Sequence, residues 1–151
     1  MTAAGTRHNG GGFRQAYATI APPGAVPLIV ESAHPRAPSE VSVVKYWRAD
    51  LAAEPRADPA GPPRILIGDF NATLDHAALR SLISHGYRDA GDATGRGFAT
   101  TWGPYDGDPI PPVTIDHVLV DQRIGVRDLW VGSLPRSDHR MVVASLTVPA
   151  K

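Results

Sequence analysis

Three short apolar segments of this chain each meet a group of acids, amides and imidazoles at one end. The polar groups are Asp-Phe-Asn after RILIG at 64–68, Asp-His within TIDHVLV at 114–120, and Ser-Asp-His before MVVASLTV at 141–148. Buried charges are costly unless they are paired or bound to a metal ion. We therefore expect the three segments to be strands whose polar ends converge on one shared pocket.

The first third of the chain predicts a hairpin followed by a loop and a helix. RQAYATI at 14–20 alternates apolar and polar side chains, VPLIVESA at 26–33 contains a short apolar run, and a Pro-Pro-Gly turn lies between them. Apolar residues at helical spacing then predict a helix over 41–53. Residues 1–13 are rich in glycine and small polar residues, so we expect a flexible N-terminus.

The rest of the chain predicts one more helix and one more strand. Helical spacing favours a helix over 75–85, which Gly86 would end. Residues 88–112 are expected to be mostly loop, and 126–131 a strand. Together the elements predict one domain over 14–149, of the α/β (α+β) class with a mixed, largely antiparallel sheet.

The composition excludes several classes of function. The chain has no cysteine, which rules out disulfides, thiolate nucleophiles and cysteine-based zinc sites. Its 15 basic and 15 acidic residues give a formal net charge of zero, which lends no support to non-specific attraction to nucleic acid. No apolar run reaches the roughly 20 residues of a membrane-spanning helix, and the N-terminus lacks the apolar segment of a secretory signal. The compartment therefore stays open.

The polar groups also form recognisable motifs. GDFNAT at 68–73, IDHVLV at 115–120 and SDHR at 137–140 resemble, in order and spacing, the three C-terminal motifs of the endonuclease/exonuclease/phosphatase family. VPLIVESAHPRAPS is similar to the strand of that family that ends in a histidine. The resemblance covers about residues 14–148. It implies the C-terminal portion of a four-layer α/β sandwich and the metal-dependent hydrolysis of a phosphate ester by an activated water.

The resemblance gives three residues a role in proton transfer. His139 matches the histidine taken as a general base or as a phosphate contact, and Asp116 matches the carboxylate that orients it. Such a pair fixes the tautomer of the imidazole and raises its basicity. Asp69 matches the aspartate that positions the water or protonates the leaving oxygen.

Three further residues match contacts to phosphate or metal. The resemblance implies that Asn71 donates an amide N–H to a phosphoryl oxygen and that His34 contacts the scissile phosphate. Asp138 matches a carboxylate that binds the metal ion or supports its ligands, and Asp69 is the other expected ligand. Hard oxygen ligands of this kind suit Mg²⁺ or Mn²⁺.

Each of these residues also fits a purely structural role. Asp69 and Asn71 have strong turn preferences. Asp116 fits the exposed side of an edge strand, His139 fits a hydrogen-bonded core histidine, and His34 fits an ordinary loop residue. Their occurrence together, in the order of the family motifs, favours the functional interpretation.

Other polar and aromatic residues receive no catalytic role. His117 is expected on the opposite face of its strand from Asp116. Three more histidines are expected on the surface: His8, His76 and His85. Three aromatic residues fit either a hydrophobic core or the wall of a substrate cleft: Trp102, Tyr105 and Trp130.

One part of the family pattern has no match in this chain. The family has an N-terminal half in which an asparagine contacts phosphate and a glutamate is the main metal ligand. None of the three glutamates follows an apolar strand as that ligand should: Glu31, Glu40 and Glu54. The chain is therefore expected to be either a fragment or a short form that pairs with a second copy. Either alternative predicts self-association, because half of a fold exposes sheet edges and apolar surface.

Two functions are accordingly expected from the sequence. The first is a Mg²⁺- or Mn²⁺-dependent phosphohydrolase that acts on nucleic acid, a phospholipid head group or a small phosphate ester. The second is a non-catalytic fragment of such an enzyme that self-associates.

Overall fold

A computed structural model describes residues 2–10, 13–103 and 111–151. The strands are β1 (Ala3–His8), β2 (Arg14–Ile20), β3 (Leu28–Ala33), β4 (Arg64–Asp69), β5 (Tyr87–Asp89), β6 (Asp116–Asp121), β7 (Gly125–Ser133) and β8 (Arg140–Thr147). The helices are a 3-10 turn (Val41–Val43), α1 (Val44–Ala52), α2 (Ala77–Ser84) and α3 (Ala90–Ala93).

The strands form two sheets. Six of them make one mixed sheet in the order β1-β2-β3-β4-β6-β5, in which β3 and β4 run parallel and the other neighbours antiparallel. The last two strands, β7 and β8, pair antiparallel as a separate sheet. The predicted mixed, largely antiparallel sheet and the hairpin of 14–20 with 26–33 are therefore confirmed.

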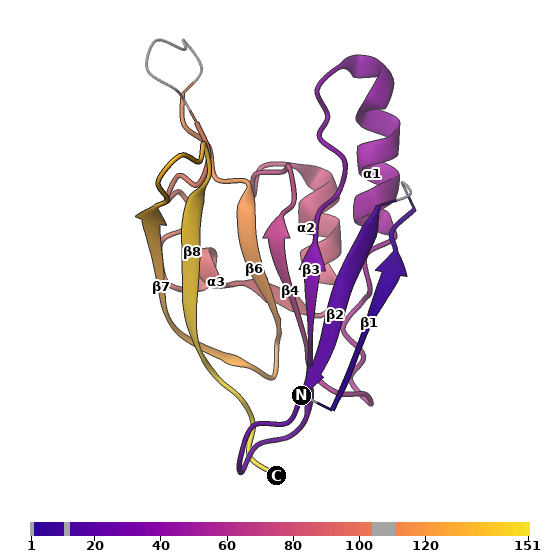
Figure 1. The fold of residues 1–151 in the computed structure, drawn as a ribbon, viewed down its shortest axis with the longest axis vertical. Coiled ribbons are helices and arrows are strands. Elements are labelled where there is room, and N and C mark those ends of the chain that lie inside the picture. The colour runs from indigo at the N-terminus through magenta and orange to yellow at the C-terminus, as the bar shows by residue number, and fades with distance from the viewer. Residues whose placement is uncertain (1, 11–12, 104–110) are drawn as a thin grey trace.

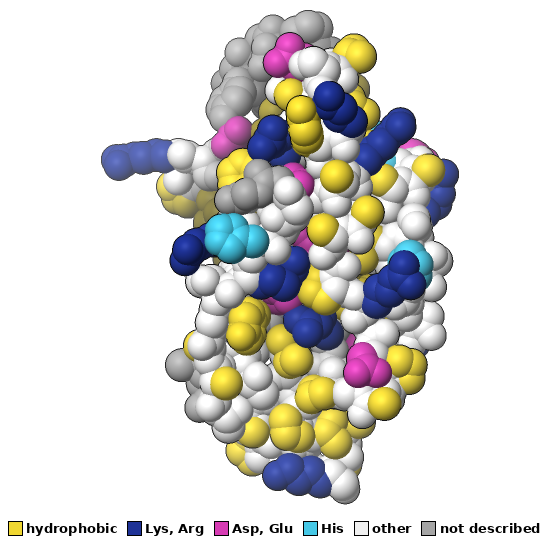
Figure 2. All heavy atoms as spheres, turned by 90° about the vertical axis from the view of Figure 1, so that its right-hand side faces the viewer, with side chains coloured by type: hydrophobic (Ala, Val, Ile, Leu, Met, Phe, Trp, Pro, Cys, Tyr) yellow, Lys and Arg dark blue, Asp and Glu magenta, His cyan; other side chains and the backbone are white. Residues whose placement is uncertain are grey.

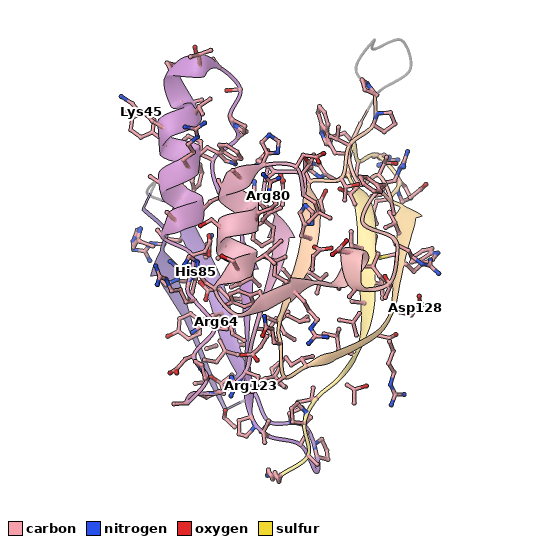
Figure 3. The ribbon with its side chains drawn as sticks, turned by 180° about the vertical axis from the view of Figure 1, so that it is seen from behind. Lys45, Arg64, Arg80, His85, Arg123 and Asp128 are labelled. Atoms are coloured by element: carbon pink, nitrogen blue, oxygen red, sulfur yellow. The ribbon has the colours of Figure 1, made fainter. Side chains whose placement is uncertain are left out.

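Within the described residues, α1 and α2 lie behind the large sheet, and β7–β8 lies next to β6 (Figure 1). Alternate residues of β4 and β6 point to opposite faces of the large sheet. Leu66 and Leu119 face α1 and α2, which cover the back of the sheet in Figure 3. Ile65 and Val118 lie on the other face, where Leu129 of β7 packs in a second core cluster. The helices thus cover one face of the sheet, whereas β7–β8 covers only part of the other, where Ile65 is buried but Ser32 and Ile67 are exposed.

The N-terminal region differs from its prediction as a flexible segment. Residues 3–8 form β1, which pairs with β2 from Ala3↔Thr19 to His8↔Arg14. This hairpin lies at the edge of the sheet beside α1, on the side that Figure 2 faces, where Lys and Arg side chains lie among hydrophobic ones. Residues 3–8 therefore belong to the large sheet.

Two short elements at 87–93 were not expected from the sequence. Residues 87–89 form β5 at the edge of the sheet, and 90–93 form one turn of helix, α3. Asp89 caps this turn because its side chain accepts a hydrogen bond from the Asp92 N–H at 2.8 Å. Elements of three or four residues leave too little periodicity to detect in a sequence.

The parallel strands β3 and β4 approach each other closely where they end. Gly68 pairs with Ala33 and has a φ of 148°. A Cβ atom at Gly68 would lie 2.1 Å from the carbonyl oxygen of Ala33. Only glycine therefore fits here, and it lets Asp69 and Asn71 follow directly beside the end of β3. No helix in the described part of the chain is long and apolar enough to cross a membrane.

Candidate active site

The polar ends of the strands meet at one end of the large sheet, which is the upper end in Figure 1. Asp69 ends β4 and is paired with Asp116, the first residue of β6. His34 follows the last residue of β3, and His139 precedes β8. The structure therefore brings together four of the residues that the sequence singled out, from segments more than 100 residues apart.

His139 and Asp116 form the shortest contact of this group. The Nδ1 atom of His139 lies 2.9 Å from Oδ2 and 3.2 Å from Oδ1 of Asp116, with the two side chains 31% and 17% exposed. Burial disfavours the imidazolium and lowers the pKa of His139. The hydrogen bond to Asp116 and the negative charges of the nearby aspartates outweigh burial, so the pKa is raised overall; these aspartates are Asp116, Asp69 and Asp138. The pair is thus built to increase the basicity of the imidazole.

Asp69 lies between two imidazoles. Its Oδ2 atom is 4.0 Å from Nε2 of His139 and 3.9 Å from Nε2 of His34. Burial raises the pKa of Asp69; the Asn71 N–H opposes the rise, and the charge of Asp116 adds to it. A carboxyl group of this kind holds a proton more readily than an exposed aspartate, so it suits proton donation as well as metal binding.

Asn71 fixes the geometry around Asp69. Its backbone N–H donates to Oδ1 of Asp69 at 2.7 Å, and its φ of 49° lies in the left-handed region, which asparagine tolerates. Its side-chain amide donates to the carbonyl oxygen of Pro35 at 3.0 Å. An amide NH₂ has two N–H groups, so this bond leaves one for a phosphoryl oxygen.

Asp138 and Trp102 are joined by a hydrogen bond. The indole N–H of Trp102 donates to Oδ2 of Asp138 at 3.0 Å. Trp102 also lines an open pocket of about 480 Å³, together with Asn71, Ile115 and His139. Trp102 therefore supports a site carboxylate and forms a wall of the cleft. Trp130 lies instead on β7 and is 50% exposed, and Tyr105 lies outside the described residues.

Thr101 was not singled out by the sequence, yet it connects the two halves of the His139–Asp116 pair. Its hydroxyl oxygen accepts hydrogen bonds from the backbone N–H groups of Ile115 and Asp116, both at 3.0 Å. Its carbonyl oxygen accepts from the Arg140 N–H at 2.7 Å, next to His139. Thr101 is 1% exposed. A threonine before a tryptophan in a loop carries no sequence signal for this role.

The remaining histidines lie apart from this group. His117 is 3% exposed and contacts Asp89 Oδ2 and the Ala72 carbonyl oxygen, both at 2.8 Å. It ties β6 to neighbouring segments on the helix side of the sheet, in line with the expectation that it faces away from Asp116. His8 and His76 are exposed, as expected, and His85 is partly buried.

A family model decides the relationship that the motifs indicated. The model described as the endonuclease/exonuclease/phosphatase family matches residues 3–139. This range includes β1 and the four residues that meet at the end of the sheet: His34, Asp69, Asp116 and His139. The chain belongs to the endonuclease/exonuclease/phosphatase family. No curated protein sequence matches it significantly.

Solved structures of endonuclease/exonuclease/phosphatase proteins share the fold. An endonuclease/exonuclease/phosphatase of Beutenbergia cavernae is 21% identical with a TM-score of 0.70, over 90% of this chain and 39% of that one. The Neisseria 3′ phosphatase NExo, bound to a product DNA hairpin, is 20% identical with a TM-score of 0.64, over 88% and 64%. A mannosyl-6-phosphatase of Bacteroides thetaiotaomicron is 16% identical with a TM-score of 0.61, over 89% and 57%. The chain thus spans between 39% and 64% of the length of these three structures.

The glutamates of this family member do not supply the metal ligand that the resemblance implies. Glu31 is bound by Arg7 and Arg64 at 2.7 and 2.5 Å, and Glu54 by Arg7 at 2.8 Å. Glu40 is exposed before the 3-10 turn. Among residues 2–10, 13–103 and 111–151, no three His, Asp or Glu side chains are placed to hold one ion.

Proposed function

We propose that this chain carries the proton-transfer half of a phosphoester hydrolase site. The observation that carries the proposal is the His139–Asp116 pair at 2.9 Å with the Asp69 carboxylate 4.0 Å from the other nitrogen of the same imidazole. A base oriented by a carboxylate and a second carboxyl group of raised pKa are what a general base and a general acid require.

The proposed reaction uses these groups in one displacement. His139 accepts a proton at Nε2 from a water molecule while the water oxygen bonds to phosphorus. The ester P–O bond breaks as Asp69, in its protonated form, gives its proton to the leaving oxygen. His34 and the second amide N–H of Asn71 contact the phosphoryl oxygens, where negative charge develops. Asp116 holds the Nδ1 proton of His139 and so directs Nε2 toward the water.

The divalent metal implied by the family enters no step of this scheme. Asp138 remains a proposed ligand from this chain. Asp69 would be a ligand only in its ionised form, in which it positions the water instead of donating a proton. The further oxygen ligands that Mg²⁺ or Mn²⁺ needs would come from water, from the substrate phosphate or from outside the described residues. The substrate is proposed only as a phosphate ester. The DNA of the Neisseria relative and the sugar phosphate named for the Bacteroides relative show how widely substrates differ on this fold.

Hydrolysis of bis(p-nitrophenyl) phosphate tests the proposed function. The wild-type chain and His139→Ala are compared with Mg²⁺, with Mn²⁺ and with a chelator. We expect the wild type to release p-nitrophenol and the variant to do so more slowly by about 100-fold or more, the usual contribution of a positioned base. Equal rates for the two proteins would reject the proposal.

A second candidate function is association without catalysis. The outer face of the β7–β8 sheet, away from the large sheet, carries Trp130, Val143 and Met141, which are 50%, 46% and 38% exposed. Trp130 is paired with Val143 and Gly132 with Met141, so the three apolar side chains form one surface. Apolar surface of this kind favours self-association, and the engaged glutamates favour a chain that does not turn over substrate alone.

Sedimentation velocity measures this association directly. At tens of micromolar protein we expect a dimer or larger species, and Trp130→Ser is expected to shift it toward monomer because the largest apolar group is lost. Val41→Ser is the matched control, since Val41 is 92% exposed before α1 and lies on another element. A wild-type chain that sediments as a clean monomer contradicts this second function.

A further inference from the structure

The His34 imidazole has little contact with the rest of the site. Its side chain is 59% exposed, and Nε2 lies 3.9 Å from Oδ2 of Asp69. That distance is too long for a hydrogen bond, so it does not fix the ring. A loop side chain this exposed samples several rotamers unless other groups restrain it. The restraint must therefore come from the residues around His34.

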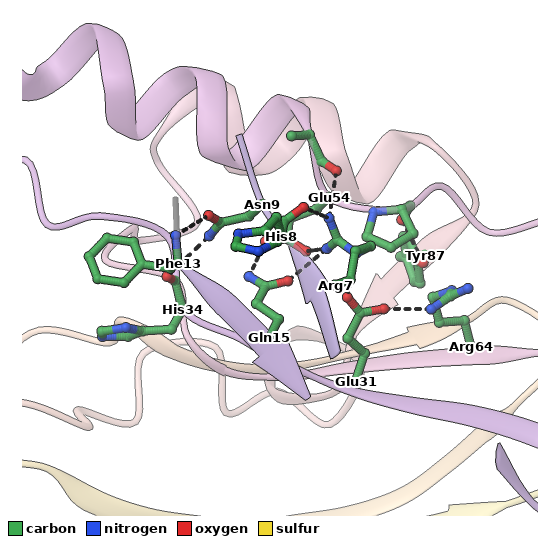
Figure 4. Close-up of polar contacts among 12 residues, drawn as sticks. Arg7, His8, Asn9, Phe13, Gln15, Glu31, His34, Glu54, Arg64 and Tyr87 are labelled. Atoms are coloured by element: carbon green, nitrogen blue, oxygen red, sulfur yellow. Dashed lines mark hydrogen bonds and ion pairs between the residues drawn. The ribbon is translucent and has the colours of Figure 1, made fainter. Parts of the chain in front are cut away.

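Asn9, in the turn between β1 and β2, reaches the backbone of His34. Asn9 is 3% exposed, and its side-chain amide donates to the carbonyl oxygen of His34 at 3.4 Å (Figure 4). It also closes the turn on Phe13: the Asn9 N–H donates to the Phe13 carbonyl oxygen at 3.1 Å, and Asn9 Oδ1 accepts from the Phe13 N–H at 3.2 Å. One buried side chain thus ties this turn to the end of β3.

Phe13 contacts the His34 ring itself. The two ring centroids are 5.8 Å apart with an angle of 74° between the planes, the edge-to-face arrangement that aromatic pairs prefer. The Arg36 guanidinium lies over the same Phe13 ring at 5.9 Å and over Tyr46 at 5.2 Å. The Phe13 ring therefore contacts both His34 and Arg36 of the same loop, and Arg36 in turn reaches Tyr46 of α1. The Phe13 contact limits the positions open to the imidazole.

The two residues after His34 are held in the same way. Pro35 has no N–H group, and its carbonyl oxygen accepts the hydrogen bond from Asn71 at 3.0 Å. The Arg36 N–H donates to Oδ2 of Asp50, a buried residue of α1, at 3.0 Å. Three successive residues of this loop are thus bound by side chains from three other segments.

We propose that Asn9 and Phe13 are positioning residues that hold the His34 imidazole beside Asp69. Asn9 acts through its side-chain hydrogen bond to the His34 carbonyl oxygen, and Phe13 through its contact with the His34 ring. The effect on catalysis rests on the proposed function, whereas the effect on the imidazole does not. The turn has this role only because β1 pairs with β2 and brings residues 9 and 13 to the end of β3, next to His34.

An NMR experiment tests the positioning without reference to activity. The ring proton resonances of His34 are assigned from their loss in His34→Ala. Phe13→Leu is expected to weaken the NOEs between the His34 ring protons and the β protons of Asp69, because the imidazole is no longer held beside that carboxylate, and to leave the His139 resonances in place. A shift of the His34 resonances alone would show only the loss of the Phe13 ring current. Ile20→Val is the matched control, since Ile20 is similarly exposed at the far end of β2. Unchanged His34–Asp69 NOEs in Phe13→Leu would overturn the proposal.

A kinetic cycle tests the consequence for the proposed reaction. We expect Asn9→Ala and Phe13→Leu each to lower kcat/KM on the order of tenfold, because small displacements of a positioned group reduce rates strongly. In a His34→Ala background the same changes are expected to have no further effect. Equal losses in both backgrounds contradict positioning through His34. A wild type without activity rejects the proposed function and leaves the NMR result to decide this inference.

Discussion

Replacing Arg7 with methionine is expected to destabilise the fold by about 3 kcal/mol, the low end of the usual cost of leaving a buried charge without its partner, because Glu54 loses the Arg7 guanidinium whereas Glu31 keeps Arg64. Nε of Arg7 binds Glu31 at 2.7 Å, and Nη2 binds Glu54 at 2.8 Å and Gln15 at 2.7 Å (Figure 4). Glu31 is 1% exposed and Glu54 4% exposed. Methionine keeps much of the side-chain volume, so the loss reports on the charge. For a domain of ordinary stability this is a large fraction of the total.

Urea denaturation at neutral pH measures this loss, with Arg14→Met as the control. Arg14 is exposed in the same hairpin, so its replacement is expected to change the free energy of unfolding by less than about 0.5 kcal/mol. Burial raises the pKa of Glu54, while Gln15 and the charge of Arg7 oppose that rise. Without Arg7 the pKa of Glu54 rises further. The loss of folding stability caused by ionised Glu54 is therefore present above the unfolded-state pKa of this group, and it decreases as acid protonates Glu54. If Arg7→Met lowers the free energy of unfolding no more than Arg14→Met does, the contacts of Arg7 with Glu31, Glu54 and Gln15 do not stabilise the fold as proposed.

These contacts of Arg7 also explain why β1 was not predicted from the sequence. AAGTRH lacks the alternation of apolar residues that marks a half-buried strand. Its stability comes from pairing with β2 and from an arginine whose partners lie 24 and 47 residues away. Contacts of that range leave no local pattern. The longer strands and both longer helices were predictable because their apolar periodicity is local.

The candidate site divides in the same way. Asp69, Asp116 and His139 could be selected from the sequence because each lies at one end of an apolar strand and belongs to a family motif. Thr101 could not, since its role depends on a loop folding back onto β6 and β8. Asn9 could not either, because its partner His34 is brought near by strand pairing.

Replacing Asp116 with asparagine is expected to lower kcat/KM by about 100-fold or more, because a correctly oriented base contributes at least that much. An asparagine side chain in this place does not hold the Nδ1 proton of His139 as a carboxylate does. The imidazole is then free to carry its proton on Nε2, the nitrogen that must accept one from water. Asp128→Asn is the matched control. Asp128 lies on β7 with its side chain 61% exposed, at the edge of the view in Figure 3, and its replacement is expected to leave the rate unchanged.

The pH profile of the same variant separates a catalytic from a structural effect. A base must be neutral to accept a proton, so activity falls as pH drops through the pKa of His139, which Asp116 raises above its ordinary value against the effect of burial. Removing the carboxylate is therefore expected to move the acid limb of kcat/KM to lower pH while the plateau falls. The raised pKa also stabilises the fold below the unfolded-state pKa, and this contribution is lost as pH rises through the folded-state value. The variant should thus lose less thermal stability in alkaline than in mildly acidic buffer. An acid limb that stays in place would show that Asp116 does not act through His139.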